Sequence, residues 1–374
     1  MPRKNHNIRF GGSFTIHHFN PQTTIQSFYF GDPNEHVDTT DVSGRMKMSS
    51  IEAQLYTEHD IVLNRWINAN VGTSFTFYHV SDKTFHSFDP RLSIRWHPVT
   101  PLTFKISYTH MSQSIHRIAS TFLDIPSDFW VPSIAVIPPV RSHQVAAGIY
   151  TQVSPEFTFS LEGYLKSTDN LLQYRHWMGL QPPAAFWEQN VTQGRGKAYG
   201  IEMEARYRTR RLTAQMAYTL SWSMRKFPEL YDGWFYDQFD NRHRLNTTIR
   251  YTMTKKISVY VALTLKSGNR VSFPTASAVN PRMPEDDDNH ELTYIYGKPN
   301  GLSLPLYHRL DLGFNFKHTT RKGHEAIWNV SVYNAYCHLN TIYAKVRQAN
   351  DGSIAAKAKG YIPIIPSVSY TIKF

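Results

Sequence analysis

The chain has a single cysteine, Cys337, and no long run of apolar residues. One cysteine excludes a disulfide framework and a cysteine-ligated metal site. Without an apolar stretch of about 18 residues, a membrane-spanning helix is excluded as well. A membrane β-barrel remains open, because its strands are apolar on one face only and therefore average out as polar.

The formal charge of +11 permits a nucleic acid or an anionic membrane surface as a partner. The Lys and Arg residues are scattered, however, and many alternate with apolar residues. The sequence has no RNP, zinc-finger or helix-turn-helix spacing. We therefore expect no nucleic-acid partner.

What the chain does contain, from end to end, is apolar–polar alternation with a period of two. Between 199 and 208, Tyr199, Ile201 and Tyr207 alternate with Glu202 and Arg206. Such alternation predicts an antiparallel strand with one apolar face. About fourteen segments show it: 8–16, 50–63, 67–77, 92–96, 102–108, 145–149, 157–161, 199–207, 212–222, 245–251, 257–265, 310–316, 328–332 and 368–374.

The connections between these segments fall into two classes. Tight turns are expected near Asn64, Val99, Pro155, Arg210, Lys255 and Lys322, and long polar loops at 20–46, 113–141, 168–197, 271–304 and 338–360. Short turns at one rim and long loops at the other are typical of outer-membrane barrels. We predict an all-β fold, a transmembrane antiparallel β-barrel portion with short periplasmic turns and long extracellular loops. A soluble sandwich or propeller is the alternative, although its strands would be shorter.

Aromatic residues and the last strand fit the membrane interpretation. Tyr199, Tyr207, Trp222, Trp96 and Trp328 lie near expected strand ends, where interfacial girdles form, although aromatics also simply favour strands. The chain ends on an alternating strand with a final Phe, the pattern that outer-membrane barrel-assembly machinery reads. The residues of this expected assembly signal are Val368, Tyr370, Ile372 and Phe374.

Several longer segments resemble the C-terminal part of a TonB-dependent receptor barrel, nearest to the starch-utilisation type of nutrient receptor. They are ISYTHMSQSIHRIAS (106–120), GRGKAYGIEMEARYRTRRLTAQMAYTLSWS (194–223), DNRHRLN (240–246), LPLYHRLDLGFNF (304–316), WNVSVYNAYCHLNTIY (328–343) and the terminal PIIPSVSYTIKF. The resemblance implies a 22-stranded barrel with an N-terminal plug, of which residues 1–374 would supply about fourteen strands. It also implies coupling to the TonB complex through that plug, and a possible surface lipoprotein partner.

Signal peptide, TonB box and plug are not recognisable in the sequence. We therefore expect a receptor fragment that would not carry out energised transport alone. The expected location is the Gram-negative outer membrane, in contact with its lipid and lipopolysaccharide. Two alternatives stay open: a self-contained fourteen-stranded channel, in which 7–19 pairs with 362–374, and a soluble β-rich binding protein.

Candidate chemistry is sparse. His17 and His18 could hold a metal or haem but are expected to be a solvated pair at the rim. The acidic run 285–291 lacks the spaced ligands of a calcium loop. Glu202 and Glu204 resemble paired carboxylates, but Arg206 and Arg208 on the same face favour a ladder of lumen charges. We expect Cys337 to be a small apolar filler, and we expect no enzyme, no cofactor, no metal and no catalytic residue.

Aromatic residues in the expected loops could form a ligand-binding rim, because aromatic faces stack on sugars and other flat nutrients. Packing within the loops is the alternative, and the sequence leaves both open. The candidates are Phe129, Trp130, Trp177, Trp187, Trp234 and Tyr236.

Overall fold

One antiparallel sheet dominates the computed structural model, which describes residues 6–20, 47–118, 129–175, 187–279, 292–348 and 354–373. Fourteen strands follow one another across this sheet in chain order, and a short fifteenth, β12, pairs with the outer end of β11. The fourteen are β1 (His6–Phe19), β2 (Met48–Val62), β3 (Ile67–Val80), β4 (Lys83–Val99), β5 (Leu102–Gln113), β8 (Val140–Gln152), β9 (Phe157–Tyr174), β10 (Val191–Arg208), β11 (Leu212–Lys226), β13 (His243–Thr252), β14 (Ile257–Lys266), β19 (Tyr307–Thr319), β20 (Glu325–Tyr333) and β23 (Ile365–Lys373).

The remaining elements belong to the connections at one rim. They are β6 (Ile115–Ile118), β7 (Phe129–Pro132), the 3-10 helix η1 (Trp187–Asn190), β12 (Phe235–Tyr236), β15 (Arg270–Val271), β16 (Pro274–Val279), β17 (Leu292–Tyr296), β18 (Leu302–Ser303), β21 (Thr341–Gln348) and β22 (Ile354–Gly360). Most of them pair into small hairpins: β6 with β7, β16 with β17, and β21 with β22. Among the residues that the structure describes, no helical segment has the length and apolarity that a bilayer crossing requires.

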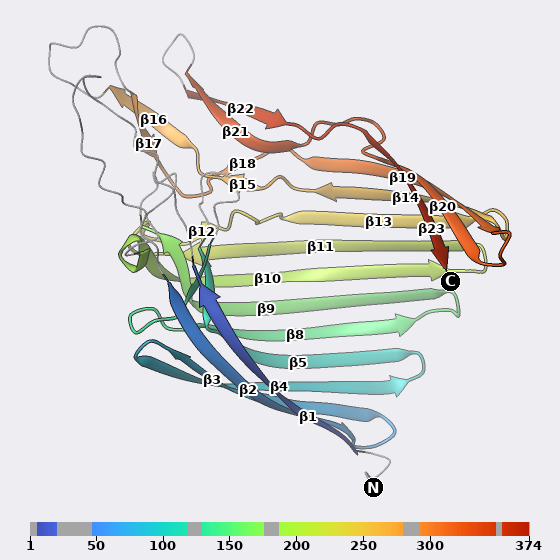
Figure 1. Cartoon of the computed structure of the whole chain (residues 1–374), viewed down its shortest axis with the longest axis horizontal. Helices are drawn as coiled ribbons and strands as arrows, with labels where there is room; N and C mark the ends of the chain where they lie inside the picture. Colours follow the sequence, from blue (N-terminus) through green and yellow to red (C-terminus); the bar gives the residue numbers. More distant parts are fainter. Residues whose placement is uncertain are drawn as a thin grey trace.

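The predicted separation of short and long connections is confirmed (Figure 1). Tight turns of two to five residues join the strands at one rim, at 63–66, 100–101, 153–156, 209–211, 253–256 and 320–324. At the opposite rim lie the long connections. A strand that leaves a short turn must run the full height of the sheet before it can meet a long loop, so the strand directions follow directly from the two loop classes.

The strands are longer than the alternation predicts. β4 begins at Lys83, after a two-residue turn at Ser81 and Asp82 on the long-loop rim, although the apolar pattern starts only at Leu92. β9 continues to Tyr174 and β10 starts at Val191, well inside the expected loop at 168–197. Near the long-loop rim, the strands continue to pair with one another although the apolar–polar alternation has ended. The outward side chains there no longer need to be apolar.

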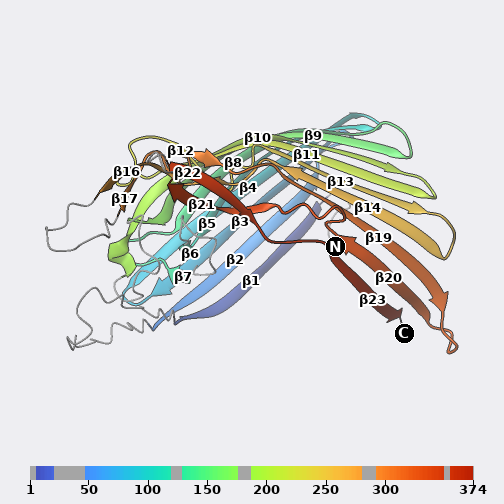
Figure 2. The same ribbon diagram turned by 90° about the horizontal axis from the view of Figure 1, so that it is seen from above.

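The sheet is strongly curved and open (Figure 2). β1 and β23 are its two end strands and lie apart in both ribbon views. Within the described residues, β1 pairs only with β2 and β23 only with β20. The pairing of 7–19 with 362–374 that a self-contained channel requires is thus not present.

The apolar face of the sheet is convex and uncovered. Its side chains are largely exposed, for example Phe10 at 82%, Leu55 at 68% and Leu165 at 64%. A sandwich would bury these rows against a second sheet. The largest described cluster of buried apolar residues lies instead in the long-loop region, around Ile118, Val131, Trp187 and other neighbours. The sheet therefore exposes its apolar face on the outside, whereas a water-soluble domain buries such a face in its core.

Candidate functional site on the concave face

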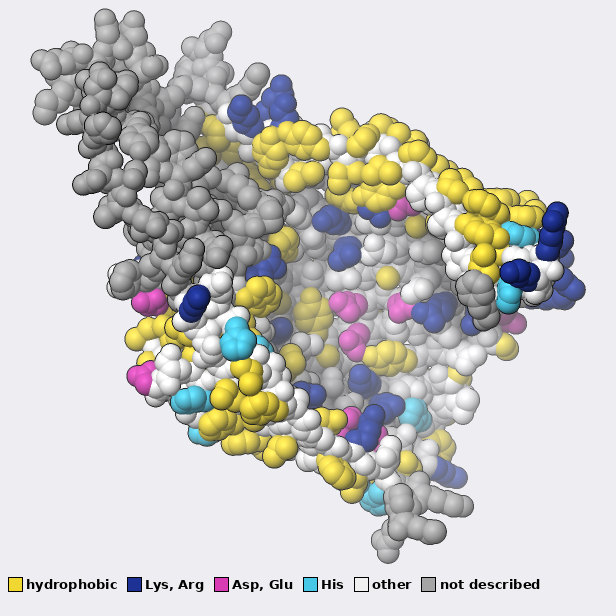
Figure 3. All heavy atoms as spheres, viewed as in Figure 1, with side chains coloured by type: hydrophobic (Ala, Val, Ile, Leu, Met, Phe, Trp, Pro, Cys, Tyr) yellow, Lys and Arg dark blue, Asp and Glu magenta, His cyan; other side chains and the backbone are white. Residues whose placement is uncertain are grey.

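Strand register assigns the polar rows to the concave face. Directly paired residues of antiparallel strands share a face, so Ile201, paired with Leu220 and Gly163, fixes the convex row of β9–β11. Glu202, paired with Glu162 and Thr219, belongs to the opposite row. In the space-filling view, acidic and basic side chains gather in the hollow of the sheet, while apolar side chains cover its flanks (Figure 3).

The first group of concave charges joins β1, β2 and β3. The Nη2 of Arg9 lies 3.0 Å from Oδ2 of Asp60 and 3.3 Å from Oε1 of Glu58. Asn70 donates from Nδ2 to both carboxylates, at 2.7 Å each. One arginine of β1, two acids of β2 and one amide of β3 thus form a lateral network over three neighbouring strands.

The second group lies in the middle of the sheet and decides how Glu202 and Glu204 should be interpreted. Oε1 of Glu204 accepts from Nη2 of Arg206 at 3.1 Å and from Nε2 of Gln215 at 2.9 Å. Glu162 accepts a hydrogen bond from the hydroxyl of Tyr150. The contacts of Glu204 are those of a ladder of charged and polar groups, as the spacing with Arg206 suggests, rather than of an acid–base pair aimed at a substrate.

The third group joins β19 to β20. Nη2 of Arg309 lies 2.9 Å from Oδ2 of Asp311, and its Nη1 donates to the hydroxyl of Tyr333 at 2.7 Å. The guanidinium carbon is 4.1 Å from the centre of the Tyr333 ring. Oδ1 of Asp311 accepts from the backbone N–H of Asn334 at 2.9 Å, which ties the start of the last long loop to the wall.

These groups give the concave face both signs of charge along its width, and Glu58, Asp60, Glu162, Glu204 and Asp311 each accept from a donor. Such a surface suits water or a polar protein segment and would be costly against hydrocarbon. No group of three or more His, Cys, Asp or Glu residues arranged to hold a metal ion occurs within the described ranges. The arrangement supports passage or docking of polar groups.

The candidate loop aromatics do not converge on one place. Trp187 is 1% exposed and packs in the loop cluster with Ile118 and Val131. Trp130, on β7, is 53% exposed. Trp234 carries Lys197 over its ring, with the Nζ 4.2 Å from the centre. Phe129 begins β7, and Trp177 lies outside the described residues.

Tyr236 is part of a cationic cluster that the alternation did not predict. Three cations lie over its ring, with Arg270 at 4.0 Å and Arg242 and Lys298 at 5.3 Å from the centre. The buried carboxylate of Asp240 pairs with Arg242 and Arg270 at 3.1 Å each. Asp240 and Arg242 lie in one connection and Arg270 in the next, and the motif 240–246 was the only local signal of the arrangement.

Other sequence-based expectations can be placed as well. His17 lies on the concave face, 3.5 Å from Glu52, and His18 contacts the hydroxyl of Ser49 at 2.9 Å, so the two imidazoles have separate partners. Cys337 does not fill a gap in a strand. It is exposed, beyond the end of β20, with φ of 55°. The filler interpretation is therefore wrong, because a turn at Asn334 ends the strand first.

The terminal strand has the predicted faces. Val368 pairs with Val330, Tyr370 with Trp328 and Ile372 with Ala326, all on the convex side. The rings of Tyr370 and Trp328 lie 4.5 Å apart. Phe374 lies outside the described residues, and the role of these residues as an assembly signal stays a prediction.

An antiparallel wall that is apolar outside, charged inside and short-turned at one rim defines an outer-membrane β-barrel protein. The chain belongs to the family described as TonB dependent receptor-like, beta-barrel, whose model matches residues 3–336. The predicted resemblance to TonB-dependent receptors is confirmed, and so is the outer-membrane location.

Solved structures with the same fold include receptors for ferric compounds. The ferric-catecholate import receptor Fiu of Escherichia coli K12 shares 12% identity and a TM-score of 0.62, over 99% of this chain and 52% of that one. The ferripyoverdine receptor of the Pseudomonas aeruginosa outer membrane shares 15% identity and a TM-score of 0.60, over 98% of this chain and 45% of that one. The ferric yersiniabactin uptake receptor FyuA of Yersinia pestis shares 14% identity and a TM-score of 0.58, over 88% of this chain and 46% of that one.

At these identities the likeness establishes the fold. The chain spans about half the length of the receptors it matches. A search of curated proteins gives no match.

Proposed function

We propose that the chain is the C-terminal part of the barrel of a receptor that takes a nutrient across the outer membrane with energy from the TonB complex. The observation that carries the proposal is the charged concave face, on which most of the named carboxylates have a hydrogen-bond donor, on a wall that is apolar outside. Such a face can line a passage filled by water and a plug. The plug, the TonB box and the remaining strands would lie in the part of the receptor that these 374 residues do not include.

The open edges support additional strands. In hydrocarbon, an edge strand leaves N–H and C=O groups without partners, at several kcal/mol each. β1 is fourteen residues long and β23 nine, so both present long edges. About eight further strands between them would complete the 22-stranded barrel that the family resemblance implies.

The extracellular ligand remains part of the proposal. Trp130 has the most accessible ring among the described candidate aromatics, so we place the first ligand contact at the β6–β7 hairpin. A glycan is the proposed ligand class, because sugar faces stack on such rings and the sequence resembles starch-utilisation-type receptors. The solved structures of the same fold import or bind iron chelates, which makes a ferric siderophore the comparison ligand.

The test compares cells with and without the whole receptor. Uptake of labelled oligosaccharides and of ferric siderophores is measured, with and without a protonophore. We expect receptor-dependent oligosaccharide uptake that the protonophore abolishes, and a several-fold loss of surface binding in Trp130→Ala. Trp187→Phe serves as a control, since its ring is buried and should affect only loop packing.

Uptake that persists with the protonophore would contradict energised transport and favour the channel. Siderophore uptake in place of oligosaccharide uptake would retain the receptor and overturn the glycan proposal.

A further inference from the structure

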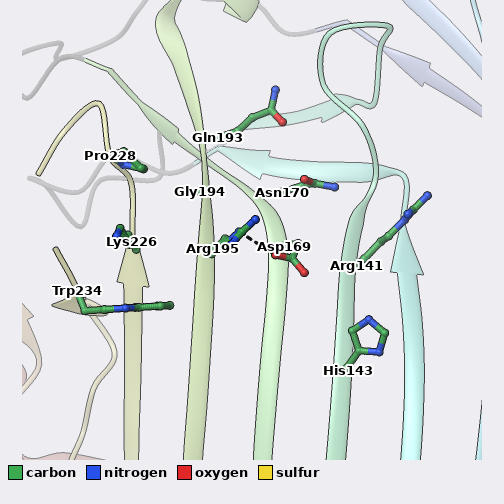
Figure 4. A pocket seen from close by; sticks show the side chains of 10 residues that line it. All are labelled: Arg141, His143, Asp169, Asn170, Gln193, Gly194, Arg195, Lys226, Pro228 and Trp234. Carbon is green, nitrogen blue, oxygen red and sulfur yellow. Dashed lines mark ion pairs between the residues drawn. The ribbon is translucent and has the colours of Figure 1, made fainter. Parts of the chain in front are cut away.

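Two hollows lie one above the other on the convex face, away from the proposed passage. The upper one, of about 920 Å³, is formed at the outer ends of β8, β9, β10 and β11 (Figure 4). Arg141, Arg195 and Lys226 bring three positive charges to its lining and Asp169 one negative charge, for a balance of 3 − 1 = +2.

Register places these charges outside the barrel. Arg141 and Arg195 both pair with Asp169, and Arg195 also pairs with Lys226, so the four residues form one lateral row. Along β10, Arg195 is separated by an even number of residues from Tyr199 and Ile201, so it lies on the same convex face. A cationic row on that side meets the membrane or its surface rather than the passage.

The height of the row matches the lipid headgroups. The rings of Tyr199 and Trp222 stack at 5.2 Å and mark the top of the apolar belt. Arg195 lies four residues above Tyr199, or roughly 13 Å along the strand. Lys197 lies between them and holds its ammonium over Trp234, a lining residue of the same pocket. Aromatic rings with cations directly above them are typical of the outer interface of a bilayer.

The lower hollow is apolar. It measures about 560 Å³ and is lined mainly by convex residues of β4, β5, β8, β9 and β10. Ala147 and Gly163 form its floor, between the larger side chains of Trp96, Ile106 and Ile201. Ala147 lies four residues below His143 of the upper pocket, roughly 13 Å along β8.

We infer that the two hollows together bind one phosphorylated, multi-acyl lipid of the outer leaflet. Its phosphate would contact Arg141, Arg195 and Lys226, and an acyl chain would occupy the groove over Gly163. Guanidinium and ammonium groups bind phosphate through charge-assisted hydrogen bonds. A free phosphate would satisfy the upper pocket alone, whereas the apolar groove beneath it favours a lipid. The inference depends on the outer-membrane location and not on what the receptor transports.

The charge variant is Arg141→Gln with Lys226→Gln, which leaves the Arg195–Asp169 ion pair of 3.2 Å intact. Its matched control is Arg210→Gln with Arg211→Gln, two exposed arginines in the tight turn between β10 and β11 at the opposite rim. The groove variant is Gly163→Leu. A Cβ there meets nothing nearer than the Gly200 carbonyl oxygen at 3.8 Å, so the side chain fits and fills the groove.

The experiment is native mass spectrometry of the whole receptor, purified from outer membranes and titrated with lipopolysaccharide, with its dephosphorylated form and with inorganic phosphate. We expect saturable binding of phosphorylated lipopolysaccharide, weakened roughly 30-fold by the charge variant. The control at the opposite rim should bind as the unaltered receptor does. Gly163→Leu should weaken the lipid and leave any phosphate binding unchanged.

Equal binding of the dephosphorylated form would overturn the proposal, as would equal losses in the two charge variants. Competition by inorganic phosphate at the concentration of the lipid would identify a soluble anion as the occupant and also contradict it. Should the charge variant fail to assemble, the dephosphorylated lipid and Gly163→Leu still decide the outcome.

Discussion

Neighbouring residues of one strand meet different solvents in this wall. In the half of β11 nearer the tight turns, Met216 is convex and 46% exposed, while the adjacent Gln215 is concave and donates to Glu204. The effect of a substitution on stability should therefore depend more on which face of the sheet the residue occupies than on its depth in the sheet. The same chemical change on adjacent residues can then have opposite results.

Met216→Arg should destabilise the protein by about 1–3 kcal/mol, because a guanidinium inside the apolar belt loses its hydration. Gln215→Arg should change stability by about 0.5 kcal/mol or less, since it keeps a donor beside Glu204. Denaturant unfolding in lipid vesicles measures both. Similar losses for the two variants would mean that the two faces of β11 are not chemically different.

The sequence could predict these wall residues because the period of two is local. It predicted the Glu202–Arg206 row and its role as a charge ladder. It could not predict the cations around Tyr236, since Arg242 comes from the connection between β11 and β13, whereas Arg270 and Lys298 come from the connection between β14 and β19, and the meeting of the two depends on the whole rim. Trp187 illustrates the same limit, because its burial depends on the docking of a distant hairpin.

Among the elements, the β6–β7 hairpin is the part of the rim whose docking should depend on pH. His116 on β6 is 3% exposed and contacts Oγ of Ser133 through Nε2 at 3.0 Å. Burial lowers the pKa of His116 to about 4, from an ordinary value of 6.5. An opened hairpin would take up a proton more readily than the docked one, so docking is fully favourable above about pH 6.5 and weakens as the pH falls toward 4.

We expect the free energy of hairpin opening to fall by about 2 kcal/mol between pH 7.5 and pH 5. Hydrogen exchange of the amides of β6 and β7, corrected for intrinsic rates, measures this change. His116→Gln cannot take up the proton and should remove the dependence. If that variant showed the same pH dependence, His116 would not be its source.

The terminal strand is the second element with a prediction of its own. Its convex row pairs with β20 through Val368, Tyr370 and Ile372. If the final residue completes the signal for barrel assembly, Phe374→Ala should lower the amount of folded receptor in the outer membrane several-fold. Thr371→Ala, on the concave row, is the control and should assemble normally. Quantitative blotting of outer-membrane fractions compares the two, and equal amounts would argue against the signal.

At the scale of the whole molecule, the sheet predicts that β1 and β23 are not neighbours. In a Cys337→Ser background, cysteines at Phe10 and Tyr370 should form no disulfide, since a disulfide needs Cα atoms within about 7 Å. Cysteines at Val330 and Val368, which are paired, should form one. Oxidation of the whole receptor followed by gel electrophoresis reads both. A disulfide between the cysteines introduced at positions 10 and 370 would support a closed fourteen-stranded channel.

Strand number, turn positions and the assignment of faces could all be predicted from the sequence, because each depends on neighbours in the chain. The lengths of β4, β9 and β10 could not, because above the belt the ladder continues without an apolar row. The lipid pocket also escaped prediction. Arg141, Arg195 and Lys226 are far apart in sequence and meet only through the register of four strands.

The most direct test of the account is a nitroxide scan along 213–221 of β11 in the outer membrane. Oxygen collisions should peak at the convex positions 214, 216, 218 and 220, and collisions with a water-soluble nickel chelate should peak at the intervening concave positions. Two out-of-phase oscillations with a period of two are the predicted result. Uniformly low access of both agents on the convex row, as for side chains packed under a second protein layer, would contradict it.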